Sequence, residues 1–332
     1  MRLKKIVDFA GSALAMVSTA WANCSNINKK TRGKLFEIVC ENQYRPSTFG
    51  IAMKKEVNEN IGIFFYHEQN FLWGNPFYSR ILEGIKTELA EHSYNSTFTL
   101  FQNSSEKLSR VLHQLEINGI IVIGNFNEKF LTKMKYLKLP AIFVDPQIRI
   151  KNYSQVLINN EDGAFNATQY LINAGHRKIG FISDELKRLS LKQRYQGYLK
   201  ALQYYSIQLN QALIQTGGFE NGYQHIKNIL ANQQPTAIFA ANDINAHLGY
   251  RAIFESNLKM PDDISMVGFD DIHMSRCLIP ALTTMRVPKE KMGSMAVRTL
   301  LNMIHNPAKE HSIITMPIEL IERESVKIIA SG

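Results

Sequence analysis

From residue 60 onward, short apolar stretches alternate with longer segments in which apolar residues recur every three or four positions. The short stretches are typical of strands buried on both faces, and the longer segments are typical of amphipathic helices. They predict strands at 61–66, 98–101, 119–123 and 141–144, with helices between them at 77–92, 107–116 and 127–136. Strands that alternate with helices in this way predict a parallel, doubly wound sheet with helices on both faces.

The same alternation begins again after residue 160. It predicts helices at 163–174, 194–204, 222–230 and 246–256, and strands at 179–182, 237–240 and 265–268. The sequence therefore predicts an α/β fold with two doubly wound parallel-sheet lobes. Two such lobes side by side would hold a ligand in the cleft at the carboxyl ends of their strands.

The first 45 residues have a different pattern, which predicts three short helices. The first helix, 4–10, ends at Gly11, whose backbone permits a tight turn into the second helix, 13–21. Asn28 is a suitable cap for the third helix. This arrangement describes an all-α helix-turn-helix head, whose second helix would enter the major groove of DNA. Any small three-helix bundle would give the same pattern.

A short segment at 46–59 joins this head to the α/β region. Pro46 favours an extended approach and then the start of a short helix. Such a helix is marginally stable in water and would form firmly only when docked on another surface. We therefore expect a head at 1–45, a hinge helix and linker at 46–59, and a two-lobed core for effector binding and dimerisation at 60–332.

The charge of the chain is concentrated at its N-terminus. Residues 1–60 contain ten Lys and Arg against five Asp and Glu, whereas the whole chain of 332 residues has a net charge of +9. A basic segment of this kind suits nucleic acid, although basic termini are often merely solvated. The three cysteines, Cys24, Cys40 and Cys277, are too widely spaced for a disulfide framework or a zinc motif, and they favour the cytoplasm. No apolar run approaches the ~20 residues that cross a bilayer.

The N-terminus also allows a different interpretation. Early basic residues, an apolar or small stretch at 9–20 and the sequence Ala20-Trp21-Ala22 resemble a cleaved leader. The protein would then be an exported, periplasmic-type sugar-binding protein. Asp8 and Gly11 interrupt the apolar stretch and count against a leader.

The sequence offers little for catalysis. It has no phosphate-binding loop, no nucleophile elbow and no metal-spaced cluster of His and Cys. His176, His273 and His305 are scattered along the chain. We therefore expect no enzyme activity, no catalytic residue, no metal and no cofactor.

Several motifs span most of the chain: Asn-Pro-Phe-Tyr at 75–78 with Gly84, Asn-Gly-Ile-Ile at 118–121, Gly-His-Arg-Lys-Ile at 175–179, Pro-Thr-Ala-Ile-Phe-Ala-Ala-Asn-Asp at 235–243, Pro-Asp-Asp-Ile-Ser-Met-Val-Gly-Phe-Asp-Asp at 261–271, Pro-Ala-Leu-Thr-Thr at 280–284 and Glu-Leu-Ile-Glu-Arg-Glu-Ser at 319–325. Their order resembles that of the lactose/galactose-repressor family of bacterial regulators. Gly11, Tyr44 and Pro46 also match the family in the head without a gap, which argues against the leader.

The resemblance implies a cytoplasmic, homodimeric transcriptional regulator with a periplasmic-binding-protein-like core. Each head would read half of an operator, and paired hinge helices would wedge into the minor groove. A small effector between the lobes would control the hinge. The expected function is repression of sugar-utilisation genes, with operator DNA and a sugar or sugar phosphate as partners and no membrane association.

The resemblance also assigns DNA contacts to the head and hinge: Leu14, Ala15, Ser18, Thr19, Asn28, Thr31, Tyr44, Ser47 and Met53. The recognition helix departs from the family pattern, because Thr19 replaces a customary Arg and neither Leu14 nor Ala15 can hydrogen-bond a base. Contacts with thymine methyl groups remain possible, so we expect an A·T-rich operator. Alternatively, the head has lost its affinity for DNA.

The effector residues that the resemblance assigns lie at strand ends and at the cleft mouth: Phe77, Tyr78, Asp145, Arg194, Phe219, Asn242 and Asp270. A guanidinium, an aromatic plate and carboxylate or amide acceptors suit a sugar or sugar phosphate better than a purine. Singly, each residue would also fit a structural role. We interpret Asp271 and Glu161 as surface ion-pair or capping residues, and Asp243 as a helix cap.

Overall fold

The computed structural model describes residues 60–66, 75–101, 117–124, 126, 128–136, 139–307 and 310–329. The chain divides into two units at Asn60, and all of these residues belong to the second unit, Asn60–Gly332. The predicted head, the predicted hinge and the helix predicted at 107–116 lie outside the described residues. Among the described residues, no helix is both long enough and apolar enough to span a membrane.

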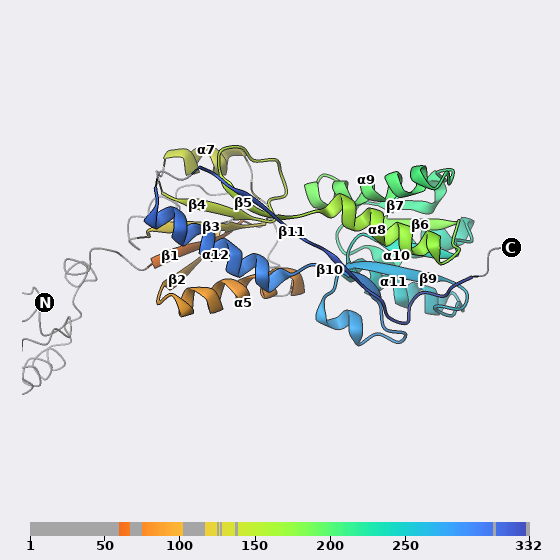
Figure 1. Ribbon diagram of the computed structural model, residues 1–332. Helices are drawn as coiled ribbons and strands as arrows, with labels where there is room; N and C mark the ends of the chain where they lie inside the picture. The colour runs from red at the N-terminus through yellow and green to blue at the C-terminus, as the bar shows by residue number, and fades with distance from the viewer. Residues whose placement is uncertain are drawn as a thin grey trace, which may run out of the picture. The chain divides into compact units, whose positions relative to one another are not determined.

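The first lobe is built on a wholly parallel sheet with the strand order β11-β5-β4-β3-β1-β2 (Figure 1). Its strands are β1 (Asn60–Tyr66), β2 (Asn95–Phe101), β3 (Gly119–Ile123), β4 (Ala141–Val144), β5 (Ser154–Ile158) and β11 (Ile313–Met316). Its described helices are α5 (Pro76–Glu91), α7 (Glu128–Tyr136) and α12 (Lys289–His305). The chain order reverses on either side of β1, as in a doubly wound sheet.

The second lobe repeats this plan with the strand order β12-β10-β9-β8-β6-β7, and only β12 runs antiparallel, against β10. Its strands are β6 (Ile179–Ser183), β7 (Ile214–Thr216), β8 (Ala237–Ala240), β9 (Ser265–Asp270), β10 (Thr283–Arg286) and β12 (Glu319–Ile321). Its α-helices are α8 (Asn160–Asn173), α9 (Leu189–Tyr204), α10 (Gly222–Asn232) and α11 (Asp243–Glu255). The chain crosses between the lobes after β5, after β10 and after β11 (Figure 1).

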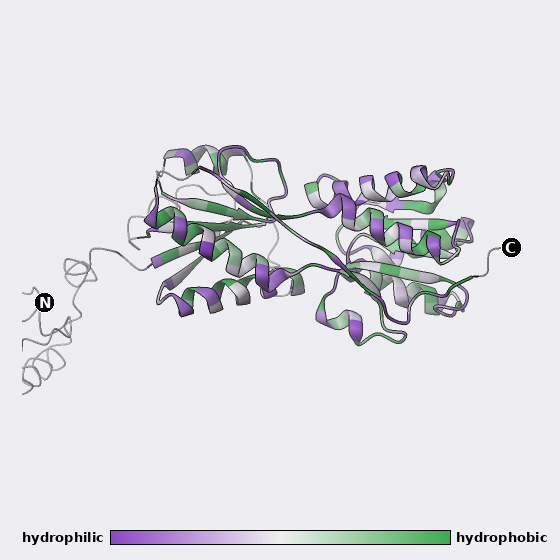
Figure 2. Ribbon diagram, in the orientation of Figure 1, coloured by the Kyte–Doolittle hydropathy of each residue, from purple (hydrophilic) through white to green (hydrophobic). Residues whose placement is uncertain are grey.

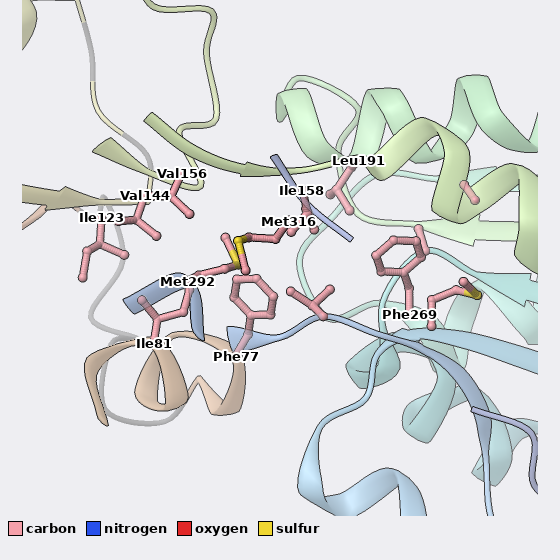
Figure 3. Close-up of a cluster of buried hydrophobic side chains, with 14 of the residues drawn as sticks. Phe77, Ile81, Ile123, Val144, Val156, Ile158, Leu191, Phe269, Met292 and Met316 are labelled. Atoms are coloured by element: carbon pink, nitrogen blue, oxygen red, sulfur yellow. The ribbon is translucent and has the colours of Figure 1, made fainter. Parts of the chain in front are cut away.

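Alternating side chains of the central strands explain why helices cover both faces of each sheet. In β1, Ile61, Ile63 and Phe65 join a core with α5 and α12, whereas Phe64 joins a separate core with α7. The central strands β3, β4 and β8 are accordingly apolar along their length, whereas the helices carry both apolar and polar residues (Figure 2). The larger core continues from the first lobe into the second, where Leu191 and Phe269 lie beyond the crossover strands (Figure 3).

The two doubly wound parallel-sheet lobes are confirmed, but several elements were not predicted: β5, β7, β10, β11 and α12. β5 begins with Ser154 and Gln155, which interrupt the apolar run expected of a buried strand. β7 has only three residues, and β11 is an edge strand whose Ile313 is 64% exposed. The prediction for α9 started five residues too late, because its first turn carries the polar residues of the cleft.

α5 and α12 pack closely because each has a glycine at the contact. A Cβ atom on Gly84 would lie 2.0 Å from the carbonyl oxygen of Glu290, and one on Gly293 would lie 2.2 Å from that of Ile81. The helices would have to separate to accept either methyl group. We therefore expect Gly84→Ala to lower the free energy of unfolding by about 2 kcal/mol. Urea denaturation would measure this loss, and Lys86→Ala, on the exposed side of the same helix, should leave stability nearly unchanged.

Candidate effector site

A cavity of about 70 Å³ lies between the lobes, and its walls come from the carboxyl ends of strands in both sheets. All seven residues predicted for effector binding line this one cavity: Phe77, Tyr78, Asp145, Arg194, Phe219, Asn242 and Asp270. Parallel strands point their carboxyl ends the same way, which is why residues distant in sequence meet here. We call this cavity the cleft.

Arg194 lies deep in the wall of the second lobe and is 4% exposed. Its Nε donates to Asn160 Oδ1 at 2.9 Å and one terminal nitrogen donates to the carbonyl oxygen of Ala241 at 2.6 Å. Its guanidinium carbon lies 3.7 Å from the ring centroid of Phe269, a cation–π contact. The protein itself therefore fixes the direction in which Arg194 points before any ligand arrives.

Asp270 ends β9 and lies next to Arg194. Its φ angle is 111°, a backbone conformation that residues other than glycine rarely adopt. The other terminal nitrogen of Arg194 lies 3.0 Å from Asp270 Oδ1. The two groups pair by charge, but this buried oxygen has no well-directed hydrogen-bond donor among the described residues. Burial raises the pKa of Asp270, while the charges of Arg194 and Lys289 oppose that rise. The oxygen is an acceptor that a ligand hydroxyl could satisfy.

Asp145 faces the cleft from the first lobe, directly after β4. Its carboxylate accepts hydrogen bonds from the Tyr78 hydroxyl at 3.3 Å and from Gln147 Nε2 at 2.8 Å. Burial raises its pKa to about 7, and the negative charge of Asp270 adds to this rise against the opposing effect of Arg194. The cleft thus holds acidic groups from both lobes that disfavour each other's ionised form.

Aromatic rings form the apolar part of the cleft wall. The ring of Tyr78 meets those of Phe65 and Phe77 edge to face, at centroid distances of 5.3 and 5.2 Å. On the second lobe, the Arg188 guanidinium lies over Phe219, 5.6 Å from its centroid. The sequence did not single out Arg188, which immediately precedes α9 and lines the same cavity.

Asp184 is a second residue that the sequence interpretation missed. It follows β6, and its carboxylate accepts hydrogen bonds from Asn242 Nδ2, Asn245 Nδ2 and the backbone NH of Glu220. Asn242 in turn caps α11 by accepting from the backbone NH of Asn245 at 2.8 Å. Asn242 therefore lines the cleft but is also occupied in holding the wall together. Its position after a strand signalled the site, and the same signal would have found Asp184.

Asp243 does not cap α11, so its interpretation as a helix cap is wrong. Asn242 is the cap, and Asp243 is the first helical residue. Its fully buried carboxylate accepts hydrogen bonds from Ile272 NH, Ser275 Oγ and Thr284 Oγ1. It thereby anchors the turn that follows β9, outside the cleft. Glu161 and Asp271 form ion pairs as expected, with Lys200 and with Arg286 and Arg323.

Gln147 connects the lobes across one edge of the cleft. Its Oε1 accepts from Ser190 Oγ at 2.7 Å and its carbonyl oxygen accepts from Leu189 NH at 3.1 Å. Its amide nitrogen holds Asp145, as described above. These bonds join the loop after β4 to the first turn of α9, so Gln147 holds the two lobes together by hydrogen bonds.

We expect Gln147→Ala to weaken the contact between the lobes, because it removes side-chain hydrogen bonds worth about 1 kcal/mol each. The lobes should separate more often, which would raise the radius of gyration in small-angle scattering. Lys151→Ala, an exposed change beyond the same loop, is the matched control. An unchanged scattering profile for Gln147→Ala would argue that other contacts hold the lobes.

The predicted DNA contacts lie outside the described residues: Leu14, Ala15, Ser18, Thr19, Asn28, Thr31, Tyr44, Ser47 and Met53. The part of the chain that the structure describes contains no group of three or more His, Cys, Asp or Glu side chains placed to hold a metal ion.

Comparison with known proteins extends over nearly the whole chain. The family described as periplasmic binding protein-like domain matches residues 168–326. The chain is 31% identical to the HTH-type transcriptional repressor PurR of Histophilus somni (strain 2336), over 98% of this chain and 99% of that protein. It is 30% identical to the ribose operon repressor of Haemophilus influenzae, over 98% of each chain.

Solved structures show the same fold. The lac repressor bound to ONPG in its repressed state has a TM-score of 0.80 at 25% identity, over 98% of this chain and 99% of that one. The lac repressor dimer bound to operator and the anti-inducer ONPF has a TM-score of 0.81 at 24% identity, with the same coverage.

Proposed function

Since the chain belongs to the lactose/galactose-repressor family of transcriptional regulators, we propose that it represses genes of sugar utilisation under the control of a sugar bound in the cleft. The similarity to HTH-type repressors covers 98% of the chain, so it includes most of the basic N-terminal segment. This coverage supports a DNA-binding head over a cleaved leader.

The observation that carries the effector proposal is the unsatisfied oxygen of Asp270 beside a preoriented Arg194. A sugar hydroxyl could donate to Asp270 while accepting from a neighbouring guanidinium. The CH face of a sugar ring could lie against Phe77 or Phe219, which line the cavity. Ligands of this kind therefore match both the polar and the apolar parts of the wall.

The charge of the cleft favours a sugar over a sugar phosphate. Its lining contains four carboxyl groups and only two guanidinium groups: Asp145, Asp184, Glu220 and Asp270 against Arg188 and Arg194. A phosphate group would add up to two negative charges beside carboxyl groups whose ionised forms already disfavour each other. We therefore narrow the effector to an unphosphorylated sugar.

On the DNA side, the proposal retains the contacts predicted for the head and hinge. The protein would act in the cytoplasm as a homodimer on a roughly palindromic operator, with no catalytic step and no cofactor. Affinity would come largely from phosphate neutralisation by the basic segment, and specificity from the recognition helix.

Selection of bound DNA sequences by the full chain tests the function. We expect a palindromic site whose half-sites are A·T-rich opposite Leu14 and Thr19, because methyl contacts replace guanine contacts there. Retention should weaken steeply with salt. A central guanine preference in each half-site would refute the assignment of these contacts, and no enrichment at all would indicate a head that has lost DNA binding.

Thermal denaturation with a panel of sugars, their phosphate esters and purine bases tests the effector. A ligand at a hundred times its dissociation constant stabilises a protein by about 2.7 kcal/mol. The expected result is stabilisation by an unphosphorylated sugar that also changes operator retention. Stabilisation by a purine base alone would overturn the sugar assignment.

A further inference from the structure

A second cavity, of about 220 Å³, lies beside the crossover from β10 to α12 and has the opposite charge. Its lining contains five Arg and Lys side chains and two acidic ones: Arg80, Arg276, Arg286, Lys289 and Arg323 against Asp271 and Glu290. Arg80 pairs with Glu290 at 2.6 Å. Arg80 and Glu290 come from helices of the first lobe, whereas Arg276 and Arg323 come from the second. We call this cavity the basic pocket.

Two of the arginines are held in place by Asp271. Arg286 Nε lies 2.7 Å from Asp271 Oδ2, and a terminal nitrogen of Arg323 lies 2.6 Å from Oδ1. Glu319 forms a second ion pair with Arg286 at 3.7 Å, but its side chain is 70% exposed, so water screens this pair more than the one with Asp271. Asp271 therefore orients the two guanidinium groups, and an anion could replace the weak contact with Glu319.

Further positive charge comes from Lys289 and Arg276. Lys289 is 4% exposed and its ammonium group donates to the carbonyl oxygens of Asp270, Asp271 and Val287, with no carboxylate among these partners. Arg276 is exposed at the pocket rim and makes no ion pair with the described residues. Burial lowers the pKa of Lys289, while the nearby charges of Asp270, Asp243, Asp271 and Glu290 oppose that change. An anion in the pocket would act in the same direction as these carboxylates and favour the ammonium form.

The basic pocket and the cleft share one stretch of backbone. Asp270 lines the cleft, its neighbour Asp271 lines the basic pocket, and Ile272 lines both. Both aspartates have positive φ, at 111° and 50°, and Lys289 holds both of their carbonyl oxygens. An anion that draws Arg286 and Arg323 away from Asp271 would therefore act on the residue next to Asp270. The two cavities are placed to influence each other.

We propose that the basic pocket is a second ligand site, which binds a small phosphate-bearing molecule and thereby adjusts the affinity of the cleft for its effector. The adjustment rests on the proposed function of the cleft, whereas anion binding does not. A small molecule is favoured over the phosphates of duplex DNA, because a cavity of about 220 Å³ can hold a small phosphate-bearing molecule but not a double helix.

Thermal denaturation of the full chain in inorganic phosphate or pyrophosphate, against chloride at equal ionic strength, tests the site without any effector. Arg276→Gln removes an unpaired charge from the pocket rim, and Arg149→Gln removes an exposed charge elsewhere as the matched control. We expect both anions to raise the Tm of the wild type and of Arg149→Gln, with a several-fold weaker apparent affinity in Arg276→Gln. Equal responses in all three proteins, or no response, would overturn the proposal.

Asp271→Asn provides a test in the opposite direction. It releases Arg286 and Arg323 from their carboxylate while keeping every basic side chain, so phosphate should bind more tightly than to the wild type. Unchanged or weaker phosphate binding in Asp271→Asn would also contradict the site. If no sugar binds the cleft, these phosphate results still stand, so failure of the proposed function and failure of the second site are distinguishable.

Discussion

Arg194→Ala is expected to abolish the response to the effector and to lower the free energy of unfolding of the core by about 3–5 kcal/mol. The stability loss follows from what the guanidinium holds in the folded protein. Without it, Asn160 Oδ1 and the carbonyl oxygen of Ala241 lose a donor, and Asp270 loses its positive partner inside the protein. Urea denaturation would measure the stability, and effector-dependent release of operator DNA would measure the response.

Operator binding itself should survive Arg194→Ala at temperatures where the core remains folded, because the DNA contacts are assigned to residues before 60. A variant that loses DNA binding but responds normally to effector would contradict the assignment of Arg194 to the cleft.

Arg188→Ala is the matched control, because it removes the other guanidinium of the cleft. Arg188 contacts Phe219 and forms no ion pair with the described residues, so its loss should weaken effector binding with little change in stability. The two variants would thus separate ligand contact from structural support. Similar stability losses in both would show that Arg188 has a structural role that its contacts do not reveal.

The cleft residues could be predicted from the sequence because their polar side chains stand at the ends of parallel strands. Asp145 follows β4, Asn242 follows β8 and Asp270 ends β9, so an alternating pattern of strands and helices was enough to bring them together. Gln147 and Ser190 were missed as a pair, because a hydrogen bond between two loops of different lobes leaves no periodic signal in the sequence.

The fold was predictable where apolar runs are continuous, and less so where a strand is short or polar residues interrupt it, as in β7 and β5. β3 and β4 are buried at every position and were predicted at their observed bounds. β7 and β11 lie at or near sheet edges, where partial exposure allows polar residues and hides the strand pattern. α12 returns to the first lobe after β10, and that crossover depends on packing against α5 rather than on local sequence.

Asp145→Asn should change how the stability of the core depends on pH. The folded protein holds the pKa of Asp145 at about 7, whereas an exposed aspartate has a pKa near 3.8. Between these values the folded state keeps a proton that the unfolded state releases. Stability from this group is therefore fully present below about pH 4 and is lost as pH rises to about 7, by up to ~1.4 kcal/mol per pH unit.

Asparagine does not titrate, so the free energies of unfolding of Asp145→Asn and the wild type should be closer at pH 5 than at pH 8. At pH 8 the variant should be more stable than the wild type by about 2–4 kcal/mol. Urea denaturation of both proteins at pH 5, 6, 7 and 8 would measure the difference. Asp243, whose pKa burial also raises to about 7, is present in both proteins and cancels from the comparison. A difference that stays constant with pH would show that Asp145 is ionised throughout.

The same comparison bears on the effector, because a ligand can stabilise the ionised form of the cleft carboxylates. A hydroxyl that donates to Asp145 or Asp270 would stabilise the ionised carboxylates and lower their pKa values. Effector binding near pH 7 should therefore release protons, and calorimetry in buffers of different ionisation enthalpy would detect them. In Asp145→Asn this release should shrink, which would identify Asp145 as one source of the protons.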